Sequence, residues 1–137
     1  MSEMASACIG QCAISNQPSF HIPYIYSELG DTQKTAELVE RLAKEFNSGA
    51  EGYPGDEDNG SMSAWYVLSC MGFYQMCPSR PDFTMSLPLF DEMTVKLANG
   101  KELNINRSHL NVSKMKNRVS YFDIMQGGRL EDIVSEK

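Results

Sequence analysis

The sequence has 137 residues, of which 42% are hydrophobic and 22% charged, and its formal net charge is −6. This length fits one domain of modest size. The acidic balance argues against general binding to nucleic acid or to an anionic membrane surface, because both need an excess of lysine and arginine. No stretch approaches the roughly 20 apolar residues of a membrane span. We therefore expect partners that are neither nucleic acid nor membrane.

The first residues give an expectation about the compartment. Residues 1–5 include Glu3 and lack the basic region of a signal peptide. On this ground we expect a cytoplasmic chain with reduced cysteines. An exported parent protein stays open if the natural start lies upstream of Met1.

The periodicity of the apolar residues changes near position 80. Over residues 1–79 it is helical, and over residues 80–137 it shortens to runs typical of strands. We therefore predict an α+β fold with a helical segment, residues 1–79, followed by short antiparallel β-strands in residues 80–137.

The first two expected helical pieces lie before residue 30. Residues 1–9 are rich in methionine and alanine and are interpreted as the end of a helix. Residues 19–29 predict a helix with Ser19 as its N-cap and Gly30 as its C-terminal stop.

Two further helices follow. Asp31 or Thr32 is expected to cap one of them. Its apolar residues repeat at intervals of three and four and comprise Ala36, Val39, Leu42, Ala43 and Phe46. Another helix is expected from Ser61 or Ser63 to Gly72.

The strand predictions begin with a hairpin. Residues 93–97 and 101–105 alternate on either side of Asn99-Gly100, a strong hairpin turn signal. The polar tract that follows has little periodicity and is interpreted as a mobile connection. Residues 118–124 and 130–134 are weaker strand predictions.

An acidic loop at residues 52–60 is the most informative segment. It places Asp56, Glu57 and Asp58 between glycines, just before a helix. Like charges this close repel, unless a cation or the positive end of the helix compensates. In an extended loop the two aspartates share one side, which suits a general base or a cation site. The alternative is a solvated acidic turn that caps the helix.

An EF-hand is the obvious rival interpretation of this loop. Counted from Asp56, the sixth position is Ser61 rather than glycine and the twelfth is Val67 rather than glutamate. The pattern therefore argues against a free-standing calcium hand.

A second segment, residues 15–24, combines amides, an imidazole and aromatic rings. The amide oxygens of Asn16 and Gln17 are suitable calcium ligands. His21 is either a substrate contact or a buried structural histidine.

Together these segments resemble glycoside hydrolase family 92. The family motif Gly/Ser-Asn-Glu/Gln-Pro-Ser-x-His-x-x-Tyr-Leu/Ile-Tyr is matched by Ser15-Asn16-Gln17-Pro18-Ser19-Phe20-His21-Ile22-Pro23-Tyr24-Ile25-Tyr26. A second motif is matched by Gly55-Asp56-Glu57-Asp58-Asn59-Gly60-Ser61-Met62-Ser63-Ala64-Trp65-Tyr66-Val67. Gly72-Phe73-Tyr74, Cys77-Pro78 and Asp123-Ile124-Met125-Gln126-Gly127-Gly128-Arg129-Leu130 are similar to later family motifs.

The resemblance implies part of a calcium-dependent exo-α-mannosidase that inverts configuration and acts on mannose-containing glycans. It implies that residues 1–79 belong to an (α/α)6 toroid. Asp58 would be the general base, assisted by Asp56, and Asn16 and Gln17 would bind Ca²⁺. His21 would contact the substrate.

Two departures from the family limit this expectation. The family's general acid, a glutamate, lies upstream of the matched motifs, so the chain alone would lack it. Members that cleave α-1,2 linkages often have His-Glu-Gly just before Asn16, where this chain has Ala13-Ile14-Ser15.

Further interpretations stay open. The chain is either an incomplete glycosidase, a non-catalytic sugar- or calcium-binding module, or half of a split enzyme. In these cases we expect a partner in the missing N-terminal portion of the enzyme or in self-association. A last alternative is an interaction domain without a ligand.

Overall fold

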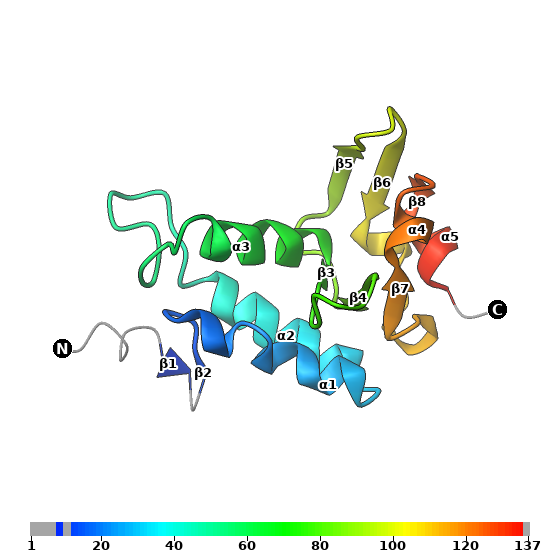
Figure 1. Cartoon of the computed structure of the whole chain (residues 1–137). Helices are drawn as coiled ribbons and strands as arrows, with labels where there is room; N and C mark the ends of the chain where they lie inside the picture. The colour runs from blue at the N-terminus through cyan, green and yellow to red at the C-terminus, as the bar shows by residue number, and fades with distance from the viewer. Residues whose placement is uncertain (1–7, 10–11, 136–137) are drawn as a thin grey trace.

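The computed structural model describes residues 8–9 and 12–135, and it has a mixed α+β fold. Helices occupy the first part of the chain and two three-stranded sheets the second (Figure 1). This order is the one predicted from the sequence. None of the helices in the described part is long and apolar enough to cross a membrane.

The chain enters the described part through a short hairpin. Strand β1 (Cys8–Ile9) pairs antiparallel with β2 (Cys12–Ala13). The predicted helix end is therefore wrong at residues 8–9, while residues 1–7 lie outside the described residues. Helix propensity is a weak preference, and here pairing with β2 satisfies the backbone instead.

The helix predicted for residues 19–29 is broken into three pieces. They are η2 (Gln17–Ser19), η3 (Ile22–Tyr24) and α1 (Ile25–Glu28). Pro18 and Pro23 each lie in the first turn of a 3₁₀ helix. Because proline has no N–H to donate, a continuous α-helical ladder cannot pass through these positions. Gly30 ends the segment with φ +97°, as expected.

The two longer helices match their predictions. Helix α2 (Thr32–Ala43) is capped by Asp31, whose carboxylate accepts a hydrogen bond from the Lys34 N–H at 2.9 Å. Helix α3 (Ser61–Met71) runs between Gly60 and Gly72, which both have left-handed φ angles. The apolar faces of these helices pack in a core of Ile14, Phe20, Tyr24, Val39, Leu42, Met62 and Trp65.

The second part of the chain holds the two larger sheets. One has the order β3 (Phe73–Tyr74), β4 (Asp82–Met85), β7 (Arg118–Ser120), and the other has β5 (Glu92–Lys96), β6 (Glu102–Asn106), β8 (Gly128–Arg129). The predicted hairpin is confirmed by the antiparallel pairing of β5 with β6. Strand β8 pairs parallel with β6, so the sheets are not wholly antiparallel as predicted.

The polar tract after the hairpin forms two 3₁₀ turns, η4 (Arg107–His109) and η5 (Val112–Lys114). The side chains of Asn106 and Asn111 accept hydrogen bonds from backbone N–H groups two residues on, at 3.0 and 3.1 Å. These local caps give the tract a regular structure that its weak periodicity did not predict.

The end of the chain corrects two strand predictions. Residues 118–124 begin as β7 but continue as helix α4 (Tyr121–Ile124). The predicted last strand is helix α5 (Leu130–Val134). Leu130 and Val134 are both 0% exposed, and their spacing of four places them on one helical face.

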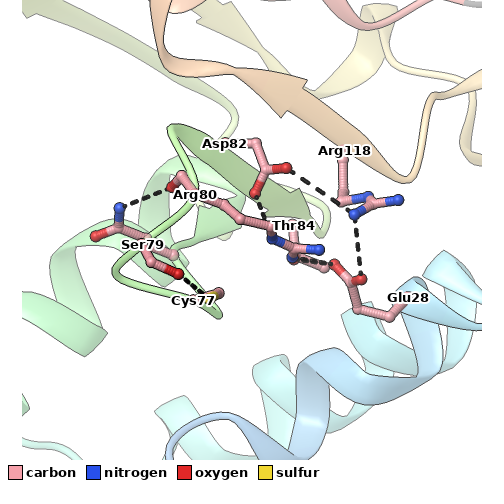
Figure 2. Close-up of polar contacts among 8 residues, drawn as sticks. Glu28, Cys77, Ser79, Arg80, Asp82, Thr84 and Arg118 are labelled. Carbon is pink, nitrogen blue, oxygen red and sulfur yellow. Dashed lines mark hydrogen bonds and ion pairs between the residues drawn. The ribbon is translucent and has the colours of Figure 1, made fainter.

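A polar network joins the helical part to the sheet. Glu28 of α1 accepts a hydrogen bond from the Thr84 hydroxyl of β4 (Figure 2). Its carboxylate lies 3.7 Å from the Arg80 guanidinium and 3.8 Å from that of Arg118. Asp82 of β4 lies 3.4 Å from Arg80 and 3.9 Å from Arg118. These alternating charges fix α1 against β4 and β7.

Candidate active site

The first site segment is the turn that leads from β2 into η2. The Asn16 N–H donates to the Ala13 carbonyl at 3.0 Å, and Asn16 itself is extended, with φ −141° and ψ 132°. Gln17 and Pro18 then begin η2, and Gln17 is exposed. The turn therefore presents successive amide side chains at the start of a short helix.

The acidic loop lies directly against this turn. A Cβ atom built on Gly55 would stand 2.3 Å from the carbonyl oxygen of Ser15 and 2.8 Å from its Cα. Only glycine allows such an approach of two backbones. Asn16 follows Ser15, and Asp56 follows Gly55, so the two predicted segments meet at neighbouring residues.

Two hydrogen bonds from α3 hold the first segment in place. The Trp65 indole N–H donates to the Phe20 carbonyl at 3.0 Å. The hydroxyl groups of Tyr24 and Ser69 are hydrogen-bonded at 2.7 Å within the core. Burial raises the pKa of Tyr24, so the phenol stays protonated and available for this bond.

The three acids of the loop have different environments. The Glu57 carboxylate accepts hydrogen bonds from the Ser63 hydroxyl at 2.6 Å, the Gly60 N–H at 2.5 Å and the Ser63 N–H at 3.2 Å. The Ser63 hydroxyl, followed by the Gly60 N–H, lowers the pKa of Glu57. Glu57 therefore caps α3, as the alternative interpretation expected for the loop.

The two aspartates take no part in this cap. Asp56 is exposed and Asp58 half-buried. Asp58 and Asn59 have φ angles of 58° and 57°, a left-handed conformation that is rare outside glycine, although aspartate and asparagine tolerate it. Left-handed backbone at non-glycine residues is often found at functional sites. Asp56 is open to solvent, and Asp58 is partly so.

His21 lies at the other end of the first segment. It precedes η3, and its side chain makes no capping hydrogen bond there. It is exposed, so the alternative of a buried structural histidine is wrong. An exposed imidazole next to the anchored Phe20 carbonyl is compatible with a contact to a bound molecule.

The oxygen atoms near the Ser15–Gly55 contact are of the kinds that bind hard cations such as calcium. Within residues 12–135, no three His, Cys, Asp or Glu side chains form a group that could hold a metal ion. In the acidic loop, the Glu57 carboxylate is engaged by the start of α3. The Ser15 hydroxyl is buried without a hydrogen-bond partner in the described part, next to the amides of Asn16 and Gln17. Such neutral oxygens are ligands that calcium accepts.

Sequence reasoning missed three residues of this arrangement. Ser15 and Gly55 form the contact between the segments. Ser63 forms hydrogen bonds with Glu57 and so gives Glu57 a different environment from the two aspartates. The spacing of six between Glu57 and Ser63 matches no capping pattern, and the Ser15–Gly55 contact joins residues distant in sequence. The sequence gives no signal for these three residues; the single tryptophan indicates only the anchor to Phe20, because a buried indole N–H needs an acceptor.

Comparison with known proteins gives the family. The model of the glycosyl hydrolase family 92 catalytic domain matches residues 1–135. The chain belongs to this family.

Solved structures of the family have the same fold. An α-mannosidase of family GH92 from Bacteroides thetaiotaomicron superposes with a TM-score of 0.80 at 25% identity, covering 90% of this chain and 19% of that one. With mannoimidazole bound, the same protein gives a TM-score of 0.83 at 24% identity, over 93% of this chain and 19% of that one. A GH92 inverting mannosidase from Bacteroides thetaiotaomicron VPI-5482 gives 0.71 at 34% identity, over 84% of this chain and 18% of that one.

A curated relative is an uncharacterized secreted glycosidase from Arthroderma benhamiae. It is 27% identical over 84 residues, which are 61% of this chain and 11% of the relative. The chain thus spans about a tenth to a fifth of the length of these relatives.

Proposed function

We propose that the chain supplies part of the active site of an exo-acting α-mannosidase that cleaves mannose-containing glycans with inversion. The observation that carries the proposal is the packing of Gly55 on Ser15, which brings the acidic loop to the amide turn. Both segments lie within residues 1–135, which match the family, and two solved members are named an α-mannosidase and an inverting mannosidase.

In this proposal Asp58 is the general base. Its carboxylate takes a proton from the water molecule that attacks the anomeric carbon, and Asp56 helps to hold that water. The left-handed turn at Asp58 and Asn59, fixed by the Glu57 cap, sets the direction of the Asp58 carboxylate. Inversion also needs a general acid about 6.5–9.5 Å away across the sugar. We expect the rest of the catalytic domain, or a partner chain, to supply that residue.

Asn16 and Gln17 are the proposed calcium ligands, and His21 the proposed sugar contact. Calcium bound there would hold the hydroxyl groups of the mannose ring and favour its distorted form. The turn is kept in place by the Trp65–Phe20 hydrogen bond, so the amides are oriented before any ligand arrives.

A mannose-release assay tests the proposed activity. An activated aryl α-mannoside and α-linked mannobioses are incubated with the chain, with calcium or with EDTA. The chain is used alone and together with an upstream family 92 segment. We expect calcium-dependent release with both parts present, lost in Asp58→Asn. Asp123→Asn is the control, because it makes the same carboxylate-to-amide change at an exposed residue in α4, outside the two site segments. Equal activity of Asp58→Asn and the control would contradict the assigned base.

Binding gives a second readout that does not need turnover. A specific calcium site stabilises the folded chain by about 2.7 kcal/mol at a hundredfold excess of calcium over its Kd. We expect this stabilisation to disappear in Asn16→Ala. Sugar or calcium binding without release by any combination of segments would favour a non-catalytic module. No effect of calcium or mannoside on stability would favour the interaction domain.

A further inference from the structure

A groove of ≈ 510 Å³ opens between the end of α2, the loop after it and α3. Its lining includes the aromatic residues Phe46, Tyr53 and Tyr66. The loop side is formed by Asn47 and by the small residues Ser48, Gly49, Ala50 and Gly52. Its volume falls within the roughly 300–1,000 Å³ of small-molecule sites.

The rings of the groove are held before any ligand binds. Phe46 packs 4.8 Å from the Tyr66 ring centroid and meets Tyr53 edge-on at 6.2 Å and 83°. The Tyr53 hydroxyl lies 2.8 Å from that of Ser63. A ring fixed in this way loses little conformational entropy when a ligand stacks on it.

The groove and the candidate active site share one loop. Tyr53 lines the groove, and Gly55, two residues later, packs on Ser15. Ser63 links the two sides, because its hydroxyl contacts that of Tyr53 and donates to the Glu57 carboxylate. The groove is therefore joined to the proposed site through residues 53–57 and Ser63.

We propose that this aromatic groove binds a further sugar residue of the same glycan, beside the mannose that Asp58 serves. The inference rests on the proposed function. A sugar ring has apolar C–H faces and a rim of hydroxyl groups. The aromatic walls suit the faces, and the Ser48 hydroxyl in the lining and the Tyr53 hydroxyl suit the hydroxyl groups.

The test compares a monosaccharide with an oligosaccharide. Methyl α-mannoside and an α-linked mannotriose are titrated into the full chain in calcium, and the Kd and the aromatic NMR shifts are measured. We expect the trisaccharide to bind roughly tenfold more tightly, the gain of one good ring contact. Tyr53→Ala removes that advantage, whereas Tyr53→Phe keeps it because the ring remains.

Tyr121→Ala is the matched control. Tyr121 is 43% exposed and Tyr53 46%, but Tyr121 lies in α4, outside the groove. We expect this variant to keep the advantage of the trisaccharide. The shifts of Tyr53 and Tyr66 should move with the trisaccharide alone.

The possible failures differ from one another. If both sugars bind and Tyr53→Ala keeps the trisaccharide advantage, the groove proposal is wrong and the proposed function stands. If neither sugar binds, with or without an upstream family segment, both are overturned. If the trisaccharide shifts the groove resonances but Asp58→Asn leaves mannose release unchanged, the groove proposal holds and the assigned base does not.

Discussion

Replacing Gly55 with alanine tests the contact on which the site depends. The new Cβ would lie 2.3 Å from the Ser15 carbonyl oxygen, although real Cβ contacts essentially never fall under 3.0 Å. The Ser15 atoms nearest the new Cβ are its carbonyl oxygen, Cα and Cβ, and none of these can rotate away as the end of a long side chain could. The loop and the turn must therefore separate. Overpacking of this kind costs about 1–3 kcal/mol.

Urea unfolding and amide chemical shifts measure the two consequences. We expect the free energy of unfolding to fall by about 1–3 kcal/mol. Shifts should change in residues 13–19 and 55–60, on both sides of the contact, and methyl α-mannoside should bind more weakly. Gly100→Ala is the control, because Gly100 has φ +80° but nothing within 4 Å of the added Cβ. It should lower stability by strain alone and leave the site shifts unchanged.

The outcome that refutes this reasoning is specific. If Gly55→Ala unfolds within about 0.5 kcal/mol of the wild type, the range of a neutral surface substitution, the two segments are not in contact in solution. Unchanged shifts in residues 13–19 would lead to the same conclusion. The proposal that the acidic loop and the amide turn act together would then lose its support.

Three further substitutions test the anchors and the cap. Trp65→Phe leaves the Phe20 carbonyl without its donor, so we expect a loss of about 1–3 kcal/mol in urea unfolding, and no loss would contradict the bond. The folded-state pKa of Glu57 lies below its ordinary 4.5. The ionised Glu57 carboxylate therefore stabilises the fold above pH 4.5, and this contribution declines as the pH falls through the folded-state pKa. The difference in Tm between wild type and Glu57→Gln should shrink in that acid range. Burial raises the pKa of Tyr24 above its ordinary 10.0, so the stability of the wild type should decline as the pH rises beyond 10. The stability of Tyr24→Phe should decline less. Equal slopes of stability against pH in the two proteins would refute a buried, protonated Tyr24.

Local signals account for the elements that the sequence predicted well. The Asp31 cap and the three-four spacing of apolar residues lie within one segment, and both specify α2. The Asn99-Gly100 turn likewise specifies the hairpin without help from the rest of the chain.

The secondary-structure predictions were wrong where contacts between residues distant in sequence determine the local conformation. A strand and a helix fit residues 130–134 about equally well by composition, and the burial of both Leu130 and Val134 decides for a helix. The sequence predicts residues 19–24 as the start of one helix over 19–29, but they include the end of η2 and all of η3, two 3₁₀ turns that each have a proline in the first turn. The segment is then kept in place by Trp65, which lies 45 residues away from Phe20 in the chain. No short pattern includes that partner.

The acidic loop shows why a site needs more than its motif. By sequence, three neighbouring carboxylates are equivalent candidates for a base, a metal ligand or a helix cap. The structure separates them, because the Ser63 hydroxyl and the Gly60 N–H engage Glu57 and thereby compensate one negative charge at the start of α3. Asp56 and Asp58 take no part in that cap; Asp56 is exposed, and Asp58 is half-buried in the left-handed turn with Asn59. The cap borders the turn that holds the proposed base Asp58, so we expect Glu57→Gln to alter the pH dependence of mannose release as well as stability. An unchanged pH profile in that variant would show that the cap and the proposed base are independent.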